Sequence, residues 1–289
     1  MIFQLGTIYS NLKGFDQIAA LADATKDLSR SRLELDLVRC GFFDANMAAP
    51  VAAVLARVTD QYNAVEIVNV PPAIERILRK NQFLTLYGYE PVESGSRTVI
   101  PFRRIGLTAE GRFEEFLGEH LREKGIPRMT EGLGRVFRQS IFEVFQNCVI
   151  HSDSKLGVFV CGQFFPQLQR LDFTIADAGI GIRESVRRVY NPKISSAAAI
   201  RWALVEGHTS KTGKQPGGVG LKFLQDFIAK NGGKLQIASR RGFYECAAGE
   251  EMFSKMHGDF HGTCVNLEIN TGDTKAYCLS SEVAPENIF

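Results

Sequence analysis

The spacing of apolar residues switches between two periods several times within the first 92 residues. Segments with helical spacing follow segments that alternate like strands, and one helical segment opens with two prolines, which suit the first turn because proline has no N–H to donate. Strands that alternate with helices predict a small α/β layer fold over residues 1–92. The helices are expected at 15–28, 48–63 and 71–83, and the strands at 32–38 and 64–70.

A different pattern begins after a stretch that contains two prolines and a glycine, so we expect a linker at residues 93–104. Residues 105–275 then form a second domain, and 276–289 are expected to be a C-terminal tail. Residues 240–261 are expected to be a long connection. In the second domain the periodicity predicts helices at 111–124, 137–154, 195–207 and 219–231 and strands at 156–165, 170–179, 234–239 and 263–269.

Composition narrows the class of protein only slightly. The 289 residues, 45% of them hydrophobic, are enough for two cores. The net charge of +2 comes from interspersed basic and acidic residues, so nucleic acid is not supported as a partner. The N-terminal segment lacks the features of a secretory signal, and no run approaches the roughly 18 apolar residues of a membrane helix. We therefore expect a cytoplasmic protein that does not enter the membrane.

The six cysteines form no CxxC pair, and several lie inside apolar runs where a thiol acts as a small hydrophobic group. Disulfides are not expected in the cytoplasm. Cys246, His257, His261 and Cys264 include a zinc-like HxxxH pair, but their spacing fits no common zinc finger. We do not expect a metal at these four residues.

The predicted helix at 137–154 carries an unusual row of polar residues. Glu143, Asn147 and His151 follow one another at intervals of four, so they share one helix face beside the apolar face. Such a row on an otherwise core-facing helix is a candidate for chemistry.

Three further segments contain candidate ligand-binding residues. DAGIGI, beginning at Asp177, follows an apolar strand, and glycines there allow positive φ and a close approach to the backbone. GGVGL, residues 217–221, leads into a helix, whose free N–H groups favour anions. Lys211 and Lys214 lie in the loop before it, as do Thr209 and Ser210; this loop either supplies cations and hydroxyls to a polyphosphate or is simply solvated. Thr263 begins a later strand.

These motifs occur in the order ExxxN, DxGxG, polar loop, GxGL, GG and GT over residues 105–272. This order resembles the GHKL ATP-binding (Bergerat) fold of histidine kinases, anti-sigma-factor serine kinases, Hsp90-type chaperones, MutL and type II topoisomerases. EVFQNCVIHS is most similar to the anti-sigma-factor kinases, and the segment from Gly217 onward resembles histidine kinases. The resemblance implies an α/β sandwich with a mixed sheet that binds ATP and Mg²⁺.

The resemblance also implies roles for individual residues. Asp177 would accept the adenine amino group, Asn147 would hold Mg²⁺, and Glu143 would act as the general base. Gly179 and Gly181 would let the ring approach. His151 would lie near the phosphates or cap its helix. The residues implied in nucleotide binding are Asn147, His151, Asp177, Gly179, Gly181, Ile182, Thr209, Ser210, Lys211, Lys214, Gly218, Val219, Gly220, Leu221 and Thr263.

Residues 1–92 resemble a STAS domain, the fold of anti-sigma-factor antagonists, most clearly in their second half. In partner-switching members a serine or threonine after the turn aspartate receives phosphate. Here Ala45, Asn46 and Met47 follow Asp44, so no hydroxyl is available. We therefore expect a docking or regulatory module rather than a built-in kinase substrate.

Three functions remain open. The first is an ATPase switch that moves a partner protein or the STAS-like module; the second is a serine/threonine protein kinase; the third is a nucleotide sensor without turnover, against which Glu143 argues. Autophosphorylation at His120 is not expected, because only 22 residues separate it from Glu143, too few for the second helix of a dimerisation domain. A protein partner is expected through the STAS-like module or the loop, and a homodimer stays open.

Overall fold

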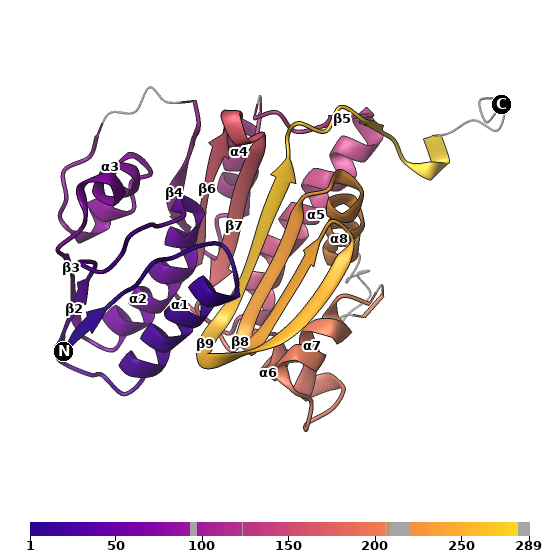
Figure 1. Ribbon diagram of the computed structural model, residues 1–289. Coiled ribbons are helices and arrows are strands. Elements are labelled where there is room, and N and C mark those ends of the chain that lie inside the picture. The colour runs from indigo at the N-terminus through magenta and orange to yellow at the C-terminus, as the bar shows by residue number, and fades with distance from the viewer. Residues whose placement is uncertain (93–96, 123, 206, 209–219, 283–289) are drawn as a thin grey trace.

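The computed structural model describes all residues except 93–96, 123, 206, 209–219 and 283–289. It confirms a mixed α/β protein, arranged in layers (Figure 1). A small sheet lies at one side, helices α1 and α2 lie between it and a larger sheet, and further helices cover the far face of the larger sheet. In the part of the chain described, no helix is long and apolar enough to cross a membrane.

The small sheet has three parallel strands in the order β1-β2-β3. Its helices begin where local chemistry favours them: the Asn11 side chain accepts a hydrogen bond from the Gly14 N–H at the start of α1, and Pro72 opens α3. The elements are β1 (Ile2–Gln4), α1 (Leu12–Thr25), β2 (Arg32–Asp36), α2 (Ala48–Asp60), β3 (Ala64–Val68) and α3 (Pro72–Lys80), with short 3₁₀ turns at Ala45–Met47 (η1) and Leu84–Tyr87 (η2).

The large sheet has the order β4-β6-β7-β9-β8, and every pairing in it is antiparallel. The expected mixed sheet is therefore wrong for the described residues, since hairpins join β6 to β7 and β8 to β9. The strands are β4 (Val99–Ile105), β6 (Val158–Phe165), β7 (Arg170–Asp177), β8 (Lys234–Ala247) and β9 (Glu250–Asn270); the helices are α4 (Glu110–His120), α5 (Glu131–His151), α6 (Gly181–Val189), α7 (Ser196–Ala203) and α8 (Gly220–Asn231).

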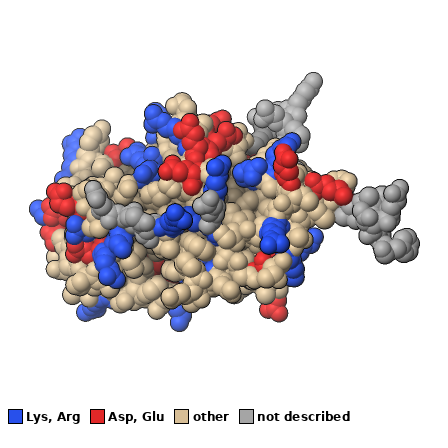
Figure 2. Space-filling view, turned by 90° about the horizontal axis from the view of Figure 1, so that it is seen from above, with Lys and Arg blue, Asp and Glu red and all other residues tan. Residues whose placement is uncertain are grey.

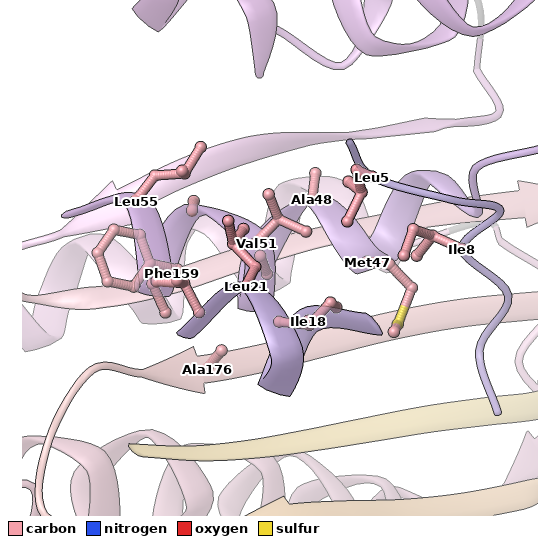
Figure 3. Packing of buried hydrophobic residues seen from close by; sticks show 14 of the residues in the cluster. Leu5, Ile8, Ile18, Leu21, Met47, Ala48, Val51, Leu55, Phe159 and Ala176 are labelled. Atoms are coloured by element: carbon pink, nitrogen blue, oxygen red, sulfur yellow. The ribbon is translucent and has the colours of Figure 1, made fainter. Parts of the chain in front are cut away.

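Successive residues of β7 serve two different layers, as the pleat of a strand requires. Leu171, Phe173 and Ile175 belong to the apolar cluster shared with α4, α5 and α8. Ala176, one residue further, belongs to the cluster shared with α1 and α2. Figure 3 shows Val51 and Leu55 of α2 beside Phe159 of β6, with Ala176 on the neighbouring strand. Both faces of the large sheet are therefore buried.

A buried hydrogen-bond network joins residues 1–92, the N-terminal module, to the face of the large sheet that α1 and α2 cover. The Asn46 amide donates to Thr174 Oγ1 at 3.1 Å and to Asn266 Oδ1 at 2.9 Å. Asn266 in turn donates to Gln236, whose own amide donates to the Ser10 carbonyl at 2.8 Å. Asn46 is fully buried, so the turn after Asp44 faces the sheet rather than solvent.

The boundaries between the predicted domains need two corrections. The expected linker, 93–104, contains most of β4, which is an edge strand of the large sheet, and the expected tail begins with the short strand β10 (Ala276–Tyr277), which pairs with β5 (Arg128–Met129). One apolar cluster also contains residues from both predicted domains, so their cores are not separate. The periodicity of a strand indicates that one or both of its faces are buried, but not which segment covers them. It therefore did not reveal the shared core.

The long connection expected at residues 240–261 is wrong: apart from Ala248 and Gly249, these residues belong to β8 and β9. They extend β8 and β9 into a long hairpin that packs against α1. The His257 ring nitrogen Nδ1 lies 2.9 Å from Asp16 Oδ2, and Gly258 has no room for a Cβ, which would lie 2.5 Å from the Ala19 carbonyl carbon. The hairpin therefore holds the N-terminal module to the large sheet.

The surface mixes charges of both signs. Figure 2 shows lysine and arginine side chains interspersed with aspartate and glutamate on the face in view. This mixture agrees with the small net charge of +2.

Replacing Asn46 is expected to weaken the attachment of the two layers. Asn46→Ala leaves the buried Thr174 and Asn266 side chains without their shared donor, so the free energy of unfolding should fall by about 2 to 4 kcal/mol. Urea unfolding measures this change. Gln167→Ala, at an exposed turn, is the control and should change stability little; equal stability of both variants would contradict the structural role of the network.

Candidate functional site

The polar row of α5 faces a pocket on the helical side of the sheet. Thr130 caps the start of α5, because its hydroxyl accepts from the Leu133 N–H, and the helix buries Ile141, Val144 and Phe145 in the core. This orientation turns Glu143, Asn147 and His151 toward one cavity. The interval of four residues thus places a carboxylate, an amide and an imidazole along one wall.

Segments distant in the sequence complete the pocket. Its empty volume is about 780 Å³, a figure that includes the open solvent at its mouth. Of the residues predicted to bind nucleotide, the structure brings these to the pocket wall: Asn147, His151, Asp177, Gly181, Ile182, Leu221 and Thr263. Glu143 is at the wall too.

Asp177 ends β7 at the base of the pocket and is buried. Burial raises the pKa of its carboxyl to about 7, although hydrogen bonds from Gly179 N–H, the Cys148 thiol and Thr263 N–H oppose this shift. The Gly179 N–H lies 2.8 Å from Asp177 Oδ1. The carboxyl group is therefore held in one orientation and changes its charge near neutral pH.

Gly179 and Gly181, which follow Asp177, need to be glycine for different structural reasons. Gly181 has φ of +79°, and a Cβ there would lie 2.8 Å from Ser239 Oγ. A Cβ on Gly179 would lie only 1.9 Å from the Ser152 carbonyl oxygen. Gly179 lies outside the lining of this pocket, and its lack of a side chain serves the packing of the turn against the end of α5. That it lets a flat ring approach stays a prediction.

Glu143 lies at the N-terminus of α8. Its Oε2 accepts a hydrogen bond from the Gly220 N–H at 3.0 Å, and a Cβ on Gly220 would lie 2.8 Å from that oxygen. A carboxylate is thus held where the helix dipole favours negative charge. The amide of Asn147 lies one turn along from Glu143, and oxygen donors of this kind suit Mg²⁺ when phosphate and water supply the other ligands.

His151 lies at the pocket, whereas the predicted residues of the polar loop are outside the part of the chain that the structure describes. His151 lines the pocket, and its backbone carbonyl accepts from Ser185 Oγ at 3.3 Å. Six predicted residues lie outside the residues that the structure describes: Thr209, Ser210, Lys211, Lys214, Gly218 and Val219.

Sequence reasoning missed several residues of the site. Trp202 and His208 line the pocket and stack on each other with ring centroids 4.7 Å apart. Trp202 is the single tryptophan of the chain and lies just before the polar loop, which is a signal that could have found it. Ser239 accepts from the Ile182 N–H at 2.9 Å and donates to the Gly262 carbonyl, a tertiary role that no local pattern reveals.

The four zinc candidates do not come together as a site. Cys246 and Cys264 are buried thiols, His257 bonds to Asp16, and His261 Nδ1 lies 2.6 Å from Arg240 Nη1. Within the described residues, no three histidine, cysteine or acidic side chains are grouped so that they could hold a metal ion.

A comparison of the sequence with models of known protein families gives no match, and a search against curated proteins gives no significant one. The class of protein therefore has to be argued from the site itself.

Gly179→Ala tests the packing of the turn. The added methyl group would meet the Ser152 carbonyl, so the free energy of unfolding should fall by about 1 to 3 kcal/mol. Gly118→Ala, in open space on α4, is the matched control and should be neutral or slightly stabilising. Thermal and urea unfolding measure both. A Gly179→Ala variant as stable as the wild type would contradict this account of the turn.

Proposed function

We propose that the protein is a cytoplasmic ATP-binding regulatory protein of the GHKL type, preceded by a STAS-like module, and that it hydrolyses Mg-ATP as a conformational switch. One observation carries the proposal. Three elements, α5, β7 and β9, bring four of the predicted residues to one pocket: Glu143, Asn147, Asp177 and Thr263. Their order along the chain is the order that the GHKL resemblance implies.

The base of the pocket suits adenine. Asp177 is a buried, oriented hydrogen-bond acceptor, and a ligand with an amino group could donate to it where water has little access. Ile182, Val186 and Leu221 supply apolar wall around it. A flat apolar ring with one outward amino group matches these features.

Asn147 and the N-terminus of α8 suit a metal and phosphates. Asn147 would hold Mg²⁺, which would neutralise charge on the phosphate oxygens. The Gly220 N–H, now bonded to Glu143, would bond to a phosphate oxygen instead, and the Glu143 carboxylate would orient and deprotonate the attacking water. Exchange of this one hydrogen bond connects nucleotide binding with the position of the general base.

Asp177→Asn is expected to weaken ATP binding about tenfold or more, because a charged acceptor is lost. Isothermal calorimetry with ATP and Mg²⁺ measures the dissociation constant. The wild-type affinity should also rise as the pH increases through about 7, because the ionised carboxylate is the better acceptor. The Asp177→Asn variant should lose this part of the pH dependence and keep only the part due to ATP itself.

Asp172→Asn is the matched control, because Asp172 is a buried aspartate of the same strand that lies among residues of the other sheet face. Its affinity for ATP should equal that of the wild type. Unchanged ATP affinity in Asp177→Asn would contradict the assignment of the adenine site.

Glu143→Ala is expected to retain ATP binding and to lose turnover by about 100-fold or more, since a general base is removed. A phosphate-release assay measures turnover, alone and with candidate partner proteins. Glu131→Ala, an exposed glutamate in the first turn of the same helix, should leave turnover unchanged.

The same assay separates the alternatives. Phosphate released to water supports the ATPase switch. Label transferred from ATP to a protein partner supports the serine/threonine kinase instead, and tight binding without either product supports a nucleotide sensor. Full turnover in Glu143→Ala would exclude Glu143 as the base.

A further inference from the structure

The turn that follows Asp177 receives a hydrogen bond from the N-terminal module. Arg57, in the last turn of α2, donates from Nη1 to the carbonyl oxygen of Ala178 at 3.0 Å. The two residues are 121 positions apart in the sequence. Figure 1 shows α2 on the side of the large sheet opposite α5 and α8, so this contact reaches the pocket turn from behind.

The pleat of β7 explains how one turn is held from two sides. Asp177 points into the pocket on the helical side, whereas Ala178, the next residue, belongs to the apolar cluster shared with α1 and α2. Ala178 is 1% exposed. Its carbonyl group is therefore held in a place where losing a hydrogen-bond partner costs free energy.

The remaining contacts of the turn come from its own domain and hold mainly N–H groups. The Ile180 N–H donates to the Ser152 carbonyl at 2.7 Å, and the Ile182 N–H donates to Ser239 Oγ. Gly262 approaches so closely that a Cβ there would lie 2.1 Å from the Asp177 carbonyl oxygen. Arg57 adds a contact to a carbonyl group of the turn, and this contact starts in the N-terminal module.

The Arg57 guanidinium is half-buried and lies near a second cation. Val54 and Val58, on either side of it along α2, are buried in the shared core. Burial lowers the pKa of the Arg57 guanidinium and neighbouring Arg240 lowers it further, while Asp259 and Asp60 raise it. Both burial and the neighbouring Arg240 oppose a charge at this position, and an apolar residue would avoid both costs.

We propose that Arg57 is a positioning residue for the turn that follows Asp177, so that nucleotide affinity depends on how the N-terminal module is docked. The inference rests on the proposed adenine site. Any partner that shifts α2 would move Arg57 and so change the position of the Asp177 carboxyl. By linkage, nucleotide would change the affinity for that partner by the same factor.

Arg57→Met tests this role, because methionine keeps an apolar stem in the half-buried position and removes every donor. Binding is followed by calorimetry and by the fluorescence of Trp202, the single tryptophan, which lines the pocket. The dissociation constant for Mg-ATP should rise about five- to tenfold. Arg57→Lys, which keeps one donor and the charge, should recover most of the affinity.

A second nucleotide distinguishes positioning from a general loss of stability. Purine riboside triphosphate lacks the 6-amino group that Asp177 would recognise, so its affinity should change much less than that of ATP, and the preference for ATP should fall in Arg57→Met. A loss of stability alone would weaken both nucleotides equally and would overturn the inference. If Arg57→Met does not fold, Arg57→Gln, whose shorter side chain does not reach the Ala178 carbonyl, replaces it.

Arg241→Met is the matched control. Arg241 also lies between the β8–β9 hairpin and the N-terminal module, since its guanidinium lies 3.6 Å from Asp23, but it donates to the His257 carbonyl and not to the carbonyl of Ala178. Its affinity for ATP should equal that of the wild type. If the wild type binds ATP and Arg57→Met binds it with the same dissociation constant, this inference alone is overturned. If the wild type does not bind ATP, the adenine site is overturned as well.

Discussion

The alternation of side chains along β7 connects the two halves of the molecule. Leu171, Phe173 and Ile175 need the helices α4, α5 and α8 to cover them, and Thr174 and Ala176 need the N-terminal module. Separating either layer from the large sheet would expose apolar surface. On the side of the N-terminal module it would also leave the polar groups that bond to Asn46 without this partner. The module is therefore part of one folded unit with the large sheet, and its motions are limited to those that preserve this contact.

The same alternation shapes the pocket. Asp177 and Ala178 are adjacent, yet one side chain faces the pocket and the other faces the module. Burial on both sides raises the pKa of the Asp177 carboxyl and makes the surrounding hydrogen bonds stronger than they would be in water. A shift on the module side of the sheet thus acts on the carboxyl group through one residue of backbone.

The turn after Asp44 illustrates how tertiary context changes the meaning of a motif. In sequence it resembles the phosphorylated turn of partner-switching proteins without the hydroxyl group. In the structure Asn46 is buried among Ser10, Thr174 and Asn266, so an amide that bonds to all three serves the interface. A docking function of the module would have to use its other surfaces.

Local periodicity by itself determined most helices and strands and the face shared by Glu143, Asn147 and His151, because a helix repeats every 3.6 residues whatever surrounds it. It did not determine that β4 lies in the expected linker, that the large sheet is antiparallel, or that 240–261 form a hairpin against α1. The reason that Gly179 is a glycine and the contact of Arg57 with Ala178 were also decided only in three dimensions. Each depends on backbone from distant segments meeting at one place, which no local pattern of residues encodes.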